Sequence, residues 1–142
     1  TPENREKYKQ LKIMDITQWL KEVVLPRIKV IRPKNRILLH PTCSCQIMGL
    51  TPVLLDIARK CAREVILPDN WGCCGASGDR GFIFPELSDS ATRDERDEIG
   101  HESFDGCYSL ARTCEIAMQD HIEQPYESIV YLVDETIQDQ GT

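Results

Sequence analysis

The stretch VILPDNWGCCGASGDRG, residues 65–81, decides how this chain folds. Its first three residues form a short apolar run, which fits a strand buried on both faces of a parallel sheet. Residues 68–70 (Pro-Asp-Asn) close that strand. A glycine-rich loop with two adjacent cysteines, Cys73 and Cys74, follows at once. We expect the rest of the chain to bring further thiols to this loop.

Two other cysteine segments stand in a similar position. Residues 37–39 (Ile-Leu-Leu) form a second apolar run that fits a buried strand, and Cys43 and Cys45 follow it. Residues 108–111 are the third strand candidate, and Cys114 comes just after them. In a parallel sheet the carboxyl ends of the strands lie at one edge, where sites normally form. The sequence therefore predicts a thiol site at that edge.

Helical patterns separate these strands. Asp15 with Gln18 has the form of a capping box before an apolar helical face over residues 16–24, which ends near Pro26. Thr51 as cap and Pro52 as first helical residue begin a helix through residue 61. Further helices are predicted over residues 85–98, 114–121 and 129–137, although residues 129–133 alone also fit a strand.

The order of these elements, β-α-β-α-β-α with short loops, indicates an α/β fold class. We expect a small three-layer domain with a short, mostly parallel sheet flanked by helices, resembling half of a Rossmann fold. Residues 29–36 are interpreted as a connector. The acidic run in residues 85–98 is interpreted as the solvated face of a helix, and Gly100 as the C-terminal cap of that helix. The whole of residues 1–142 is predicted to be one domain with a loose start over residues 1–13.

The composition narrows the class of function. A net charge of −6 and a pI near 5.1 argue against nucleic acid or an anionic membrane as partner. No apolar run approaches the length of a membrane span, and no signal peptide is visible. Seven cysteines are too few for a disulfide scaffold in a chain of this size. We therefore expect reduced, intracellular thiols that are available to a metal.

The spacing of the cysteines favours a cluster over a single ion. Structural zinc sites usually contain two Cys-x2–4-Cys pairs, whereas the close spacings here are Cys43 with Cys45 and Cys73 with Cys74. Adjacent thiolates point apart, which suits the separate attachment points of an iron–sulfur cluster better than one tetrahedral ion. Glycines at 72, 75, 78 and 81 let backbone N–H groups approach such an anionic group. The alternatives are a zinc-binding or metal-free docking domain, and a thiol redox switch formed by Cys73 and Cys74.

The remaining cysteines and histidines differ in what they offer. Cys107 and Cys114 cannot both be direct ligands if the residues between them are extended, because seven residues of strand span roughly 23 Å. Cys114 stands at a predicted strand-to-helix turn and is the better candidate. Cys61 lies on the apolar face of the helix over residues 51–61 and is interpreted as a core residue. His40 and His101 are interpreted as ordinary histidines.

Four strings together resemble a known family: HPTCSCQIMGL (40–50), GCCGASGDRGFIFPEL (72–87), RTCEIAM (112–118) and PYESIVYLVDE (125–135). They resemble the CCG cysteine-rich domain that occurs in heterodisulfide reductases and in the iron–sulfur protein of glycolate oxidase. The Gly-Asp-Arg-Gly-Phe string makes the chain most similar to the C-terminal part of FAD-linked D-lactate dehydrogenases. The resemblance covers roughly residues 14–138.

The resemblance implies a ligand set. Cys43, Cys73, Cys74 and Cys114 match cluster ligands of the family, with Cys45 as a further candidate. The implied cofactor is an iron–sulfur cluster of the 4Fe-4S type.

The loop and its surroundings also have implied roles. Gly75 and Gly78 would supply backbone donors to the cluster, and Arg80 would offset its charge. The family pattern ends in Cys-x-x-Cys, and Ala111 stands at the first of these two places.

The resemblance also implies a larger enzyme. The chain would be the C-terminal fragment of an FAD-linked D-lactate (2-hydroxy acid) dehydrogenase, partnered by an FAD domain, a first CCG copy and a downstream electron acceptor. On this view the chain is a cytoplasmic electron-transfer domain, or lies at the inner membrane through its parent enzyme. The isolated chain is then expected to be inactive toward the acid.

Overall fold

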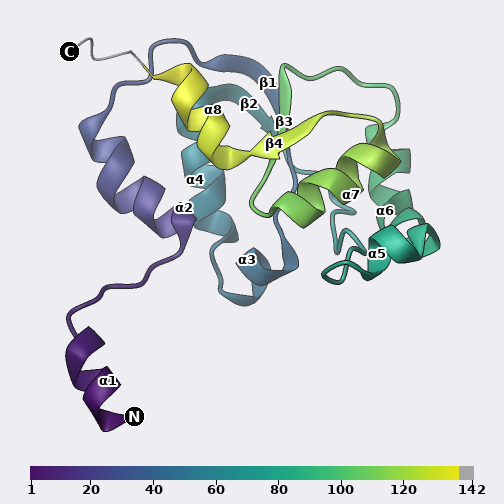
Figure 1. The fold of residues 1–142 in the computed structure, drawn as a ribbon. Coiled ribbons are helices and arrows are strands. Elements are labelled where there is room, and N and C mark those ends of the chain that lie inside the picture. Colours follow the sequence, from purple (N-terminus) through teal and green to yellow (C-terminus); the bar gives the residue numbers. More distant parts are fainter. Residues whose placement is uncertain (138–142) are drawn as a thin grey trace.

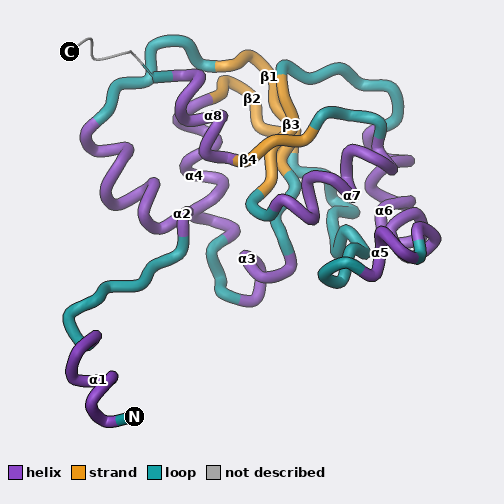
Figure 2. The backbone as a smooth tube through the Cα atoms, viewed as in Figure 1, coloured by secondary structure: helices purple, strands orange, loops and turns teal. Residues whose placement is uncertain are grey.

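A four-stranded parallel sheet lies at the centre of the computed structural model, which describes residues 1–137 (Figures 1 and 2). The strand order is β2-β1-β3-β4. Leu38 of β1 stands opposite Ile66 of β2 on one side and Cys107 of β3 on the other, and Cys107 pairs in turn with Tyr126 of β4. The strands are β1 (Lys34–Leu39), β2 (Ala62–Ile66), β3 (Gly106–Ser109) and β4 (Tyr126–Ser128).

Helices cover both faces of this sheet, which confirms the predicted three-layer α/β domain. One face packs against the α2 region, α4 and α8, and the other packs against α6 and α7 (Figure 1). The helices are α1 (Pro2–Tyr8), α2 (Ile16–Trp19), α3 (Cys43–Ile47), α4 (Thr51–Cys61), α5 (Arg80–Ile83), α6 (Pro85–Ile99), α7 (Arg112–Ile122) and α8 (Ile129–Thr136). A π-helical turn, Leu20–Val24, and a 3-10 turn, Leu25–Arg27, continue α2.

Alternation along the central strand explains how two cores form. Ile37 and Leu39 point into the core beneath α4 and α8, whereas Leu38, between them, points toward α6 and α7. All three side chains are fully buried. Because successive residues of a strand face opposite sides, a continuous apolar run is what a strand covered on both faces requires.

The strand boundaries differ from the sequence prediction. β1 begins at Lys34, inside the predicted connector, and β2 begins three residues earlier than expected, at Ala62. β2 is an edge strand, and its first half contains the exposed residues Arg63 and Glu64. A search for apolar runs therefore does not detect the start of this strand. β3 likewise begins early and ends at Ser109, and the three-residue β4 was not predicted.

The helices agree better with the prediction. Asp15 caps α2 by accepting a hydrogen bond from the backbone N–H of Thr17, and Gly100 ends α6 with a φ of 57°. Residues 129–136 form a helix and not a strand. Thr51 was wrongly predicted as a cap, since Leu50 occupies that position and Thr51 is already helical.

The predicted apolar face of the first helix is only partly buried. Leu20 of this face lies in the core, whereas Ile16 and Trp19 are exposed. α1 contributes no buried residue and stands apart from the rest of the fold (Figure 1). None of the helices formed by residues 1–137 combines the length and the apolar composition needed to cross a bilayer.

Candidate functional site

Three chain segments meet at the carboxyl edge of the sheet, as the sequence predicts. After β1 the chain continues to α3, whose first residue is Cys43 and whose cap is the side chain of Thr42. After β2 it continues to the loop with Cys73 and Cys74, and after β3 it enters α7, whose third residue is Cys114. Cys43 is therefore positioned by the end of β1, Cys73 and Cys74 by the end of β2, and Cys114 by the end of β3.

Cys74 and Cys114 are in direct contact. Their Sγ atoms lie 3.1 Å apart, although the two residues are 40 positions apart in the chain, and both side chains are buried. Cys43 and Cys73 are exposed, and both lie near enough for their charge to raise the pKa of Cys114. The fold thus gathers the four predicted thiols, with two buried and two open to solvent.

The contact between the two buried thiols favours the loss of one proton. The hydrogen bond with Cys114 lowers the pKa of Cys74 to about 6, against the effect of burial. The same hydrogen bond raises the pKa of Cys114. One thiolate shared by the pair is therefore present at neutral pH, and thiolates are the form that binds metals.

The glycine-rich loop is held tightly against α6. Gly75 has a φ of +74°, and a Cβ there would lie 2.6 Å from the backbone oxygen of Leu87. Its N–H donates to the Sγ of Cys73 at 3.4 Å. A Cβ on Gly81 would lie 2.8 Å from the Cα of Ala76, so the backbone at Gly81 packs against the backbone at Ala76 too closely for a side chain at position 81.

Gly78 and Arg80, the other two residues predicted to contact the cofactor, are exposed to solvent. Gly78 has a φ of +78° and open space around it, and Arg80 is exposed at the first position of α5. Of the two predicted glycine donors, Gly75 is the one whose N–H lies beside a thiol.

A buried polar pair lies behind the thiols, and sequence reasoning missed it. The Nδ1 atom of His40 is 3.0 and 3.2 Å from the two carboxylate oxygens of Glu95, and both residues are at least 98% buried. His40 directly follows β1 and precedes Cys43 by three residues. This position was the sequence signal that could have placed His40 at the site. Glu95 was hidden in the acidic run, whose inner face, Ser88, Thr92 and Glu95, is in fact buried.

Three cysteines lie outside the four-thiol group. Cys45 is buried among the side chains beneath α4, 4.0 Å from the hydroxyl of Thr51, and burial raises its pKa. Cys61 is a core residue of α4, as predicted. Cys107 points from β3 into the core beneath α7, where burial raises its pKa to about 12. Burial keeps these three thiols protonated, and each lacks the thiol partner that lowers the pKa of Cys74, so they are the weaker ligand candidates.

The site offers four thiols as possible ligands. Within residues 1–137, no three His, Cys, Asp or Glu side chains converge closely enough to hold a single metal ion. Four thiols grouped around Cys114, two of them reachable from solvent, with a loop N–H beside them, match the separate attachment points of an iron–sulfur cluster. Cys43, Cys73, Cys74 and Cys114 would hold such a cluster.

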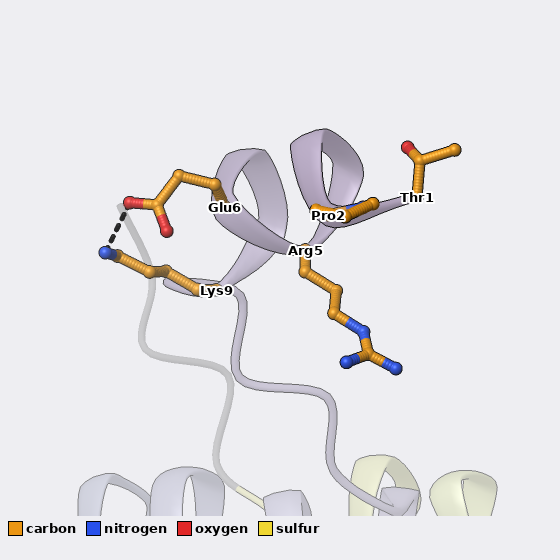
Figure 3. A pocket seen from close by; sticks show the side chains of 5 residues that line it. All are labelled: Thr1, Pro2, Arg5, Glu6 and Lys9. Atoms are coloured by element: carbon orange, nitrogen blue, oxygen red, sulfur yellow. Dashed lines mark hydrogen bonds and ion pairs between the residues drawn. The ribbon is translucent and has the colours of Figure 1, made fainter.

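A hollow at the N-terminal helix offers no comparable chemistry. It is lined by Thr1, Pro2, Arg5, Glu6 and Lys9, all from α1 and its cap (Figure 3). Lys9 and Glu6 form an ion pair on one side of the helix, and every lining residue is exposed. The hollow is therefore the open side of one solvated helix.

Comparisons of the chain with protein-family models, with curated proteins and with solved structures give no match.

Proposed function

We propose that this chain binds an iron–sulfur cluster through Cys43, Cys73, Cys74 and Cys114 and serves as an electron-transfer domain. The observation that carries the proposal is the convergence of these four thiols at one sheet edge, with Cys74 and Cys114 in contact. When bound, such a cluster supplies one-electron transfer.

The chain's own residues prepare the thiols for this role. The shared hydrogen bond makes one thiolate available near neutral pH. Gly75 places a backbone N–H beside the Cys73 sulfur, and hydrogen bonds to sulfur tune the reduction potential of clusters. Exposure of Cys43 and Cys73 gives an electron donor or acceptor a short route to the site.

The sequence resemblance supports a more specific form of the proposal. The domain would pass electrons from the flavin of an FAD-linked D-2-hydroxyacid dehydrogenase, such as a D-lactate dehydrogenase, to a downstream acceptor. Oxidation of the acid would then belong to the flavin domain. Steady oxidation of D-lactate by the purified chain alone would refute this assignment.

The decisive experiment is metal and sulfide analysis with visible and EPR spectra on chain prepared and reconstituted without oxygen. Stoichiometric iron and sulfide are expected, with loss of the signal in Cys74→Ala and Cys114→Ala. The matched control is Cys61→Ala, which removes a buried thiol outside the site and should retain the iron. Stoichiometric zinc without iron would instead favour a structural domain.

A second candidate function is a thiol switch formed by Cys74 and Cys114, which their 3.1 Å separation favours over the adjacent pair Cys73 and Cys74. A small disulfide such as oxidised glutathione would be reduced to two thiols while the pair is oxidised to one disulfide. Mass mapping of the metal-free chain after this treatment tests it. A Cys73–Cys74 linkage, or mixed disulfides alone, would contradict the assigned pair.

A further inference from the structure

The backbone of His40 is held by two hydrogen bonds, one at its N–H and one at its carbonyl oxygen. Its N–H donates to the carbonyl oxygen of Tyr108 at 2.9 Å, and its own carbonyl oxygen accepts from the hydroxyl of Ser109 at 2.9 Å. These bonds join the end of β1 to the end of β3. The ring therefore starts from a rigid position at the same edge as the thiols.

The orientation of the ring is set by Glu95. When the Glu95 carboxylate is ionised it can only accept hydrogen bonds, and Nδ1 then donates the proton in this pair. The neutral ring then presents the lone pair of Nε2 on its opposite side. The ring of Tyr126 meets the imidazole edge-on, with centroids 6.5 Å apart, and helps to keep it from turning.

The Nε2 atom is buried and has no hydrogen-bond partner among the described residues. An unpaired buried polar atom destabilises a fold. The imidazole lies close enough to Cys74 for the charge of its protonated form to lower the pKa of that thiol. The unsatisfied nitrogen thus belongs to the surroundings of the thiol site.

From this arrangement we propose that Nε2 of His40 is a nitrogen ligand of the cluster held by the four cysteines, with Glu95 as the residue that positions the ring. The inference rests on the proposed cluster-binding function. Metal-bound histidines almost always donate their other ring N–H to a carboxylate, a backbone carbonyl or water, which fixes the ring and raises its basicity. Coordination would also give the buried Nε2 atom the partner that the fold does not supply.

The test is pulsed EPR on the reduced, reconstituted full chain carrying [15N]histidine. The expected result is the strong coupling of a directly bound nitrogen, which changes with the isotope. This coupling should be lost in His40→Ala and kept in His101→Ala, where an exposed histidine is removed. Glu95→Gln keeps an acceptor for Nδ1 but removes the charge, so the coupling should remain while the midpoint potential rises.

The outcomes separate the two levels of the proposal. A cluster that forms in the wild-type chain without strong histidine coupling would overturn the ligand role of His40, including the case in which Nε2–H only donates to a thiolate. Because this measurement is made on the wild-type chain, it does not depend on whether His40→Ala folds. Failure to assemble any cluster would overturn the proposed function and this inference with it.

Discussion

At the residue scale, Cys74 shows most clearly how the position of a cysteine in the loop sets its burial and its pKa. Its neighbour Cys73 is exposed, whereas Cys74 is buried against Cys114 and has its pKa lowered to about 6. One position along the chain thus separates an accessible thiol from an internal one. This difference follows from the loop geometry and not from the residue type.

The lowered pKa predicts a pH dependence of stability in the reduced, metal-free chain. Between pH 6 and pH 9, folded Cys74 has lost a proton that the unfolded chain still holds. Unfolding therefore takes up a proton, and the free energy of unfolding rises with pH by at most about 1.4 kcal/mol per pH unit. Above pH 9 the raised pKa of Cys114 reverses the trend, because the folded pair then keeps a proton that the unfolded chain has lost.

Urea denaturation at intervals across this range measures the slope. Cys74→Ala should remove most of it. An unchanged slope in that variant would show that another group causes the pH dependence.

A second prediction at this scale concerns Gly75. Gly75→Ala should destabilise the loop and lower iron retention, because its Cβ would meet the backbone of Leu87 and Ser88 at 2.6 Å. Gly78→Ala is the matched control, since Gly78 has a similar positive φ but open space around it. The control isolates the cost of the backbone conformation, about 1–2 kcal/mol. Thermal unfolding and iron analysis should show the larger loss for Gly75→Ala, and equal losses would contradict the close packing.

At the scale of elements, the site depends on how the ends of β1 and β3 are held together. Ser109→Ala removes the hydroxyl that donates to the carbonyl of His40 and leaves that buried oxygen with one partner fewer. A loss of about 1–3 kcal/mol in the free energy of unfolding is expected. The control is Ser90→Ala on the exposed face of α6, which should have almost no effect. Equal stability of the two variants would mean that the bond does not hold this edge.

The elements also show where sequence reasoning succeeds and fails. Helices with strong periodicity or a clear end signal, such as Pro85 and Gly100 around α6, were located to within a residue or two. β4 has three residues and forms because Tyr126 pairs with Cys107 across the sheet. Such a partner lies far away in the chain, so no local pattern reveals the strand. The same holds for Glu95, whose burial depends on the position of His40.

At the scale of the whole molecule, residues 16–137 make up the three layers, and α1 stands outside them (Figure 1). α1 buries no residue, and its ion pair between Glu6 and Lys9 is exposed. Deleting residues 1–10 should therefore change the free energy of unfolding by less than about 0.5 kcal/mol and leave iron binding unchanged. Denaturant titration and metal analysis of the shortened chain test this, and a clear loss in either would assign α1 a role in the fold or the site.

The sequence by itself determined the fold class, most of the helices and the edge at which the thiols gather. It could do so because the hydrophobic pattern, its periodicity and the position of a residue after a strand are local properties of the sequence. Only the tertiary structure decided which thiols touch, since the contact of Cys74 with Cys114 joins loops that are 40 residues apart. It also decided that His40 and Glu95 meet inside the protein, because the pairing of buried polar groups depends on how α6 packs on the sheet.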